Sequence, residues 1–117
     1  MDWKNNGQTA GTTGLLKRVE AIQIKLVKRE TISVSYSTHV EDIGWMSSVK
    51  DGKTSGTTGQ SKRVEAIEIK LNSSIEKNIK YRVHVQDYGW TSWVKNGETA
   101  GTVGKSKRIE AIEIKVE

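Results

Sequence analysis

Residues 108–116 read RIEAIEIKV, and nearly the same letters occur at residues 63–71 as RVEAIEIKL and at residues 18–26 as RVEAIQIKL. The three stretches are evenly spaced, since 63 − 18 = 45 and 108 − 63 = 45. Gly-containing turns centred on Gly52 and Gly97 keep the same interval, because 97 − 52 = 45. Repetition at a fixed period of this length indicates one supersecondary unit used several times, in which no unit buries its apolar face alone.

The repeat divides the chain into one short copy and two full ones. We take the 117 residues as a single domain made of copies 1–27, 28–72 and 73–117. Three full copies would need 3 × 45 = 135 positions, so 135 − 117 = 18 are absent, and they correspond to residues 28–45. Three explanations stay open: the chain was cut there, another chain supplies the absent strand, or the fold tolerates the gap.

Each full copy contains two strand-like runs. In residues 79–86 the odd positions are apolar or aromatic and the even ones polar, and residues 32–40 alternate in the same way, with Ile32, Val34, Tyr36, Thr38 and Val40 on one face. This period of two is typical of a half-buried β-strand. Residues 109–117 place Ile112, Ile114 and Val116 on one face. Helix is the rival assignment for RIEAIEIK, but β-branched residues at i and i+2 between Gly-rich loops favour a strand.

Between these runs, Lys-Asp-Gly and Lys-Asn-Gly predict tight turns, because Asn, Asp and Gly tolerate positive φ. A shorter strand pair is expected to flank each turn, which gives an all-β chain with about four strands per copy. Three such copies can share one core around a pseudo-threefold axis. We expect a β-prism-like arrangement, with the β-trefoil as the alternative; three blades are too few for the usual propeller.

Composition excludes several classes of function. The net charge of +5 is spread along the chain among 14 carboxylates, which predicts a solvated surface and no nucleic-acid partner. No apolar run is long enough for a membrane span, no signal peptide is visible, and cysteine is absent. Two histidines, His39 and His84, predict surface or structural placement and no metal site. We therefore expect neither metal nor cofactor.

No enzyme site stands out from the residues. Glu20, Glu65 and Glu110 occur once per copy, and such repetition suits packing or multivalent binding better than one asymmetric active site. In each copy an Arg precedes this Glu by two positions. Since burying a charge is costly unless it is paired, we expect a structural Arg-Glu ion pair or a strand-end feature with a local bulge. The Ala-Gly-Thr-x-Gly segment lacks the residues of a phosphate-binding loop and is expected to be a plain connection.

The last copy carries a long spaced pattern, H-V-x-D-x-G-W-x-x-W-V-K-N-G-x-x-A-G-T-x-G-x-S-x-R-x-E-A-I-x-I, over residues 84–114. This pattern resembles the ChW repeat, the clostridial hydrophobic repeat with a characteristic tryptophan. The middle copy follows most of the pattern, but Ser48 replaces the second tryptophan, and the first copy lacks the His-Val strand. The resemblance implies a secreted or cell-surface module of Gram-positive bacteria that binds polysaccharide or surface proteins and has no catalytic role.

The tryptophans are the first candidates for a binding site, because an indole face can stack on the apolar face of a sugar ring. We expect Trp45 and Trp90 to fill the ends of strands, and Trp3 and Trp93 to be presented to solvent; all four are kept as candidate ligand-binding residues. The turn residues are candidates for bonding sugar hydroxyls, although turn geometry alone is the simpler explanation of them. These residues are Asn6, Asp51 and Asn96.

Two functions of different classes remain. The first is a non-catalytic, lectin-like carbohydrate-binding module whose weak equivalent sites act together. The second is a protein-interaction or assembly module, in which strand pairing between chains completes the fold. A polysaccharide, surface proteins and a homo-oligomer are therefore the expected partners.

Overall fold

The computed structural model describes residues 3–4, 7–13, 15, 17–25, 32–73 and 78–116. The regular secondary structure of these residues consists of β-strands alone, so the predicted all-β class is confirmed. The strands are β1 (Thr9–Gly11), β2 (Ala21–Gln23), β3 (Ile32–Val40), β4 (Gly44–Trp45), β5 (Val49–Lys50), β6 (Thr54–Gly56), β7 (Val64–Ser73), β8 (Ile79–Val85), β9 (Gly89–Trp90), β10 (Val94–Lys95), β11 (Thr99–Gly101) and β12 (Ile109–Val116).

The long strands lie where the alternating pattern predicts them. Strand β3 pairs antiparallel with β7, and β8 pairs antiparallel with β12. In β8 every odd residue is buried and every even residue is half-buried, which confirms a strand with one face in the core. The equivalent residues Tyr36 and Tyr81 are the largest fully buried side chains among the described residues. The apolar core therefore lies on the inner face of these two strand pairs.

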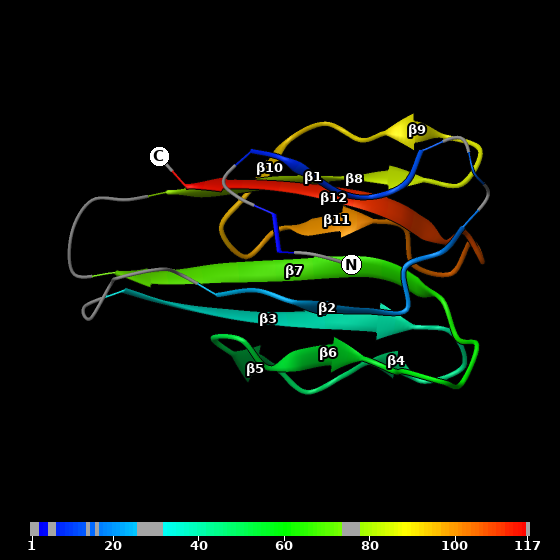
Figure 1. Cartoon of the computed structure of the whole chain (residues 1–117), viewed down its shortest axis with the longest axis horizontal. Helices are drawn as coiled ribbons and strands as arrows, with labels where there is room; N and C mark the ends of the chain where they lie inside the picture. Colours follow the sequence, from blue (N-terminus) through cyan, green and yellow to red (C-terminus); the bar gives the residue numbers. More distant parts are fainter. Residues whose placement is uncertain are drawn as a thin grey trace.

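The short Thr-Ala-Gly-type strands connect the three copies in a circle. Strand β11 of the last copy pairs with β7 of the middle copy, and β6 of the middle copy pairs with β2 of the first. Strand β1 of the first copy pairs with β12 of the last and closes the circle (Figure 1). Each copy therefore lends one strand to the copy before it, so no copy completes its sheet alone.

The backbone also joins equivalent residues of different copies near the centre. The N–H of Val64 donates to the carbonyl of Val19 over 2.8 Å, and the N–H of Val19 donates to the carbonyl of Ile109 over 2.8 Å. Because these three residues occupy the same position of the repeat, the copies meet around one common line. The β-prism and β-trefoil arrangements remain predictions beyond this circular pairing.

Gly101 shows why the Thr-Ala-Gly strand needs glycine at its end. Its φ is +103°, and a Cβ there would lie 2.5 Å from the carbonyl oxygen of Glu65 on the neighbouring strand. The expectation of a plain connecting loop is therefore wrong for Ala100 and Gly101, which belong to strand β11, whereas residues 102–104 lie outside the strand. Close approach of two backbones, and not a loop, explains this glycine.

Two expectations about the short strands also need correction. The turn at Asp51-Gly52 is confirmed, since the N–H of Lys53 donates to the carbonyl of Lys50 over 3.1 Å. The strands that flank it do not pair with each other, because β5 joins β3 while β6 joins β2. Each full copy contributes five described strands and not about four.

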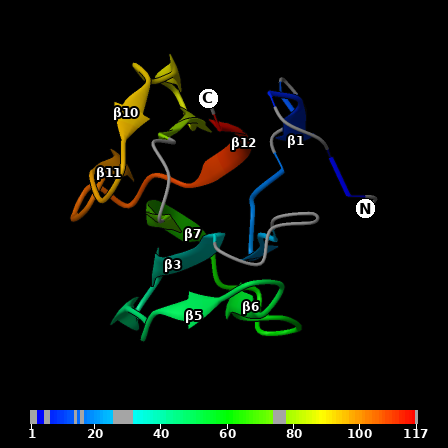
Figure 2. The same ribbon diagram turned by 90° about the vertical axis from the view of Figure 1, so that its left-hand side faces the viewer.

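The third sheet has only two described strands, β2 and β6. Strand β2 covers 3 residues, whereas its counterparts β7 and β12 cover 10 and 8 residues. The difference follows from the short first copy, since β7 and β12 are paired along their length by β3 and β8. Figure 2 looks along these long strands and shows β3 beside β7, with β1 at the far side of β12.

Candidate functional site

The outer face of β8 carries a stack of aromatic and cationic side chains. The guanidinium carbon of Arg82 lies 4.6 Å from the ring centroid of Trp90 and 4.7 Å from that of Trp93. The ammonium of Lys115 lies 4.5 Å from the centroid of Trp93. Cation–π contacts of this kind occupy indole faces that a ligand would otherwise use. In the last copy, the protein's own cations therefore take up much of the aromatic surface.

Glu113 holds Arg82 in place within this stack. A nitrogen of the Arg82 guanidinium lies 2.7 Å from Oε1 of Glu113, and the hydroxyl of Thr9 donates to the other carboxylate oxygen. Burial raises the pKa of the Glu113 carboxyl, but the hydrogen bonds from Thr9 and Arg82 outweigh this and hold the pKa below its ordinary value. The carboxylate is therefore charged and fully engaged in positioning Arg82.

A second cluster lies at the end of the same strand pair. Nδ1 of His84 lies 3.0 Å from Oε1 of Glu110, and a nitrogen of Arg108 lies 3.1 Å from Oε2. The ring of Trp90 meets His84 edge to face, with centroids 5.4 Å apart. The β12–β8 register shifts between Ile109 and Ala111, on either side of Glu110. The predicted Arg-Glu ion pair with a local bulge is confirmed, and so is the outward placement of His84.

The middle copy repeats the second cluster but not the stack. His39, Glu65 and Arg63 make the same contacts as their counterparts, at 3.0 and 2.8 Å. Ser37 stands where Arg82 stands in the last copy, and Ser48 stands where Trp93 stands, since both pairs are 45 residues apart. Small hydroxyl side chains therefore replace the bulky members of the stack.

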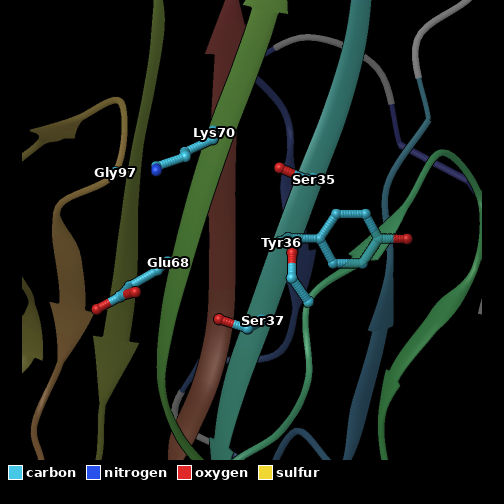
Figure 3. Close-up of a pocket in the computed structure, with 7 residues that line it drawn as sticks. Ser35, Tyr36, Ser37, Glu68, Lys70 and Gly97 are labelled. Carbon is cyan, nitrogen blue, oxygen red and sulfur yellow. The ribbon is translucent and has the colours of Figure 1, made fainter.

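These replacements leave a shallow depression of about 170 Å³ on the outer face of β3 and β7. Figure 3 shows Glu68 and Lys70 extending from β7 to one side, while the ring of Tyr36 extends from β3 to the other side, toward the core. The lining thus offers hydroxyl, carboxylate and ammonium groups to solvent. The lining residues are Ser35, Tyr36, Ser37, Ser48, Glu68, Lys70 and Gly97.

Trp45 does not line this depression, but it belongs to the same sheet. Strand β4 places Trp45 opposite His39 of β3. His39 is two residues from Ser37 and lies on the same outer face of β3. Its side chain meets the His39 ring edge to face at 5.4 Å, and 41% of the residue is exposed. Among the described residues, no cation lies over its ring. The expectation that Trp45 fills the end of a strand is wrong, because Tyr36 and not tryptophan fills the core.

The other three tryptophans differ in exposure. Trp3 is 54% exposed, as expected, with the ammonium of Lys25 4.4 Å from its centroid. Trp93 is half-buried between Arg82 and Lys115, so it is less accessible than predicted. Trp90 is half-buried too and lies outside the apolar core, although we expected it to fill the end of a strand.

The turn residues are engaged with the backbone. Oδ1 of Asp51 accepts a hydrogen bond from the N–H of Val34 over 2.9 Å. Oδ1 of Asn96 accepts one from the N–H of Leu71 over 2.6 Å. These contacts fit the simpler explanation by turn geometry. Asn6, the third candidate, lies outside the described residues.

Sequence reasoning missed the serine-lined depression. The signal that identifies it is the comparison between copies, since Ser37 and Ser48 stand where the last copy has Arg82 and Trp93. Within its own copy, Ser48 indicates only the loss of a tryptophan. The depression forms only because Ser37 is small as well as Ser48. The sequence does not show that these two serines are neighbours, because that depends on β5 pairing with β3.

The described residues contain no group of three His, Asp or Glu side chains placed to hold a metal ion. The part of the chain that the structure covers also has no helix able to cross a membrane.

Comparison with known proteins bears on the repeats directly. The sequence model of the family described as Clostridial hydrophobic W, ChW, matches residues 1–28, 39–73 and 84–117. The three matches follow the three copies and together cover most of the chain. No curated protein and no solved structure matches it.

Proposed function

The chain belongs to the clostridial hydrophobic W repeat family, and from that membership we propose that it is a non-catalytic, lectin-like carbohydrate-binding module of a Gram-positive bacterium. It acts outside the cell or at the cell surface, where the ligand is a polysaccharide. The three copies form a β-prism-like domain that presents one outer face per copy. No step of catalysis is part of this function.

The observation that carries the proposal is the open indole of Trp45 in the same sheet as a polar depression. A sugar ring needs an apolar platform for its C–H face and hydrogen-bonding groups for its hydroxyls. The exposed Trp45 provides the platform. Ser37, Ser48 and Glu68 provide hydroxyl and carboxylate groups in the depression. The middle copy is therefore the principal site.

The last copy serves as a weaker site. Arg82 lies over both Trp90 and Trp93, so a sugar would have to displace a cation that Glu113 holds. Trp3 of the first copy is exposed but has Lys25 over its ring. Unequal sites of this kind give weak binding individually, and attachment to a polymer relies on several acting together.

Binding to soluble cell-wall and plant polysaccharides, measured by affinity electrophoresis and then by calorimetry, tests the proposal. We expect Trp45→Ala to weaken binding roughly tenfold, because it removes the stacking platform. Ser48→Trp is expected to weaken it as well, since an indole would fill the depression. Circular dichroism confirms that each variant keeps the fold.

The matched control is Trp90→Ala, which removes the equivalent indole of the last copy. We expect it to change affinity by no more than about twofold, because Arg82 covers that ring. Failure of every polysaccharide to bind would contradict the proposal. So would full binding by Trp45→Ala, or an equal loss in both tryptophan variants.

A second candidate function is an assembly module completed by strand pairing between chains. It is favoured by one specific observation: strand β2 pairs only with β6 among the described residues. A strand edge with unpaired backbone groups is a template for another strand. Light scattering tests this candidate. A chain that stays strictly monomeric in solution and in mixtures with every partner tried would argue against strand pairing between chains.

A further inference from the structure

The free edge of β2 occupies a known position in the repeat. In the middle copy the equivalent edge of β7 is covered by β3, and in the last copy the equivalent edge of β12 is covered by β8. On the opposite edge, the carbonyl of Ile24 accepts a hydrogen bond from the N–H of Gly52. The N–H and C=O groups of successive residues in a strand point to alternate edges. The backbone of Gln23 therefore points to the free edge.

The register of a strand on this edge follows from the other two copies. Tyr36 lies opposite Ile69, and Tyr81 lies opposite Ile114. Since 69 − 45 = 24, a strand paired with the first copy would place a tyrosine opposite Ile24. Thr38 and Val83 show that a β-branched residue follows two positions later.

The tyrosine of each such strand also links two copies. The hydroxyl of Tyr36 accepts from the N–H of Ile24 over 3.0 Å, and the hydroxyl of Tyr81 accepts from the N–H of Ile69 over 3.1 Å. Each hydroxyl donates to a backbone carbonyl, that of Lys53 or Glu98. By the same rotation around the circle, a third tyrosine hydroxyl would lie at the N–H of Ile114.

Burial shows that the position is not filled by an equivalent strand. Ile114 and Ala10 are half-buried, whereas their counterparts Ile69 and Ala100 are buried. Val19 is half-buried, whereas its counterpart Val64 is fully buried. The residues around the first copy thus keep apolar surface that the other copies cover. That surface is lined on one side by β2 and on the other by β12.

We propose that the edge of β2 left unpaired among the described residues and the adjoining face of β12 form an acceptor site for a β-strand of a further ChW repeat. The incoming strand has a tyrosine opposite Ile24, a β-branched residue two positions later and a His-Val end. Its tyrosine hydroxyl accepts from Ile114 and fixes the register. The site does not depend on glycan binding, because it lies at the edge of a different sheet from the depression.

Titration of the folded chain with a peptide of residues 78–90, NIKYRVHVQDYGW, tests this site. We expect binding, detected by calorimetry, together with a higher melting temperature of the chain. Hydrogen exchange at the Ile114 amide is expected to slow, because that N–H gains the acceptor that Ile69 has in Tyr81. A peptide with the same composition in scrambled order is expected not to bind.

The peptide with Tyr81→Phe is the matched control, and it leaves the chain itself unchanged. We expect it to bind about fivefold more weakly, the effect of one lost hydrogen bond, without slowing exchange at Ile114. Absence of binding would overturn the proposal. Equal binding by the scrambled peptide, or an identical effect of both tyrosine and phenylalanine peptides on Ile114, would overturn it too.

Discussion

The hydroxyl of Tyr81 accepts a hydrogen bond from the backbone N–H of Ile69, 3.1 Å away, although the two residues belong to different copies of the repeat. The same hydroxyl donates to the carbonyl of Glu98, so one buried side chain ties a long strand of the middle copy to a turn of the last. Tyr36 makes the corresponding ties between the first and middle copies. These tyrosines thus stabilise the circular arrangement at its centre.

Removing the Tyr81 hydroxyl is expected to destabilise the fold. In Tyr81→Phe the N–H of Ile69 and the carbonyl of Glu98 lose a buried partner, which costs about 1–3 kcal/mol. Urea denaturation followed by tryptophan fluorescence measures the change. The control is Tyr88→Phe, whose parent side chain is 54% exposed. An unfolding free energy unchanged in Tyr81→Phe would show that the hydroxyl does not join the copies.

Tyr81 also predicts how stability responds to alkaline pH. Burial raises the pKa of Tyr81 to about 12, although the hydrogen bond from Ile69 acts in the opposite direction. Because the folded pKa lies above the unfolded value, the stability that depends on a neutral Tyr81 is complete below about pH 10 and is lost as the pH rises toward 12. Burial also raises the pKa of Tyr36 above its ordinary value.

The measurement is the unfolding free energy of the wild type and Tyr81→Phe between about pH 9 and about pH 11. Lysine deprotonation affects both proteins alike, so their difference isolates Tyr81. We expect the advantage of the wild type to shrink as the pH rises. A difference that stays constant over this interval would contradict the raised pKa.

The long strands and the bulge could be predicted because their causes are local. Alternation of apolar and polar residues specifies which face of residues 79–85 is buried, and the structure confirms it. The cost of burying a lone charge predicts the Arg108–Glu110 pair at the strand end. Both arguments need only neighbours along one strand, which the sequence provides directly.

The circular pairing and the exposure of the tryptophans could not be predicted in the same way. Whether Thr99–Gly101 pairs within its own copy or with β7 depends on how the copies meet. We expected Trp45 and Trp90 to fill the ends of strands, but Tyr36 and Tyr81 are the buried aromatic side chains, and both of their hydroxyls are hydrogen-bonded. Trp45 is left at a sheet edge as a result.

Gly101 is expected to be far less tolerant of alanine than Gly104. Both have positive φ, at +103° and +81°, so Ala costs about 1 kcal/mol of backbone strain at either site. A Cβ at Gly101 would also meet the carbonyl of Glu65 at 2.5 Å, whereas at Gly104 nothing lies within 4 Å. Thermal unfolding should show an additional loss of about 1–3 kcal/mol for Gly101→Ala alone. Equal losses in both variants would exclude the close approach of β11 to β7.

A pair of buried hydroxyls in the middle copy tests whether the copies are energetically interchangeable. Oγ1 of Thr38 lies 2.9 Å from Oγ of Ser55, and both residues are buried. The equivalent pair in the last copy is Val83 and Ala100, which is apolar on both sides. We expect Thr38→Val alone to cost about 1–3 kcal/mol, because Ser55 is left without its partner.

The double variant Thr38→Val with Ser55→Ala recreates the apolar pair of the last copy. Replacing both partners by apolar groups of similar shape is nearly neutral, so the second substitution should recover most of the loss caused by the first. Urea denaturation of the two single variants and the double variant completes the cycle. Additive losses would mean that the two hydroxyls do not satisfy each other, and that the middle and last copies pack their cores differently despite sharing one register.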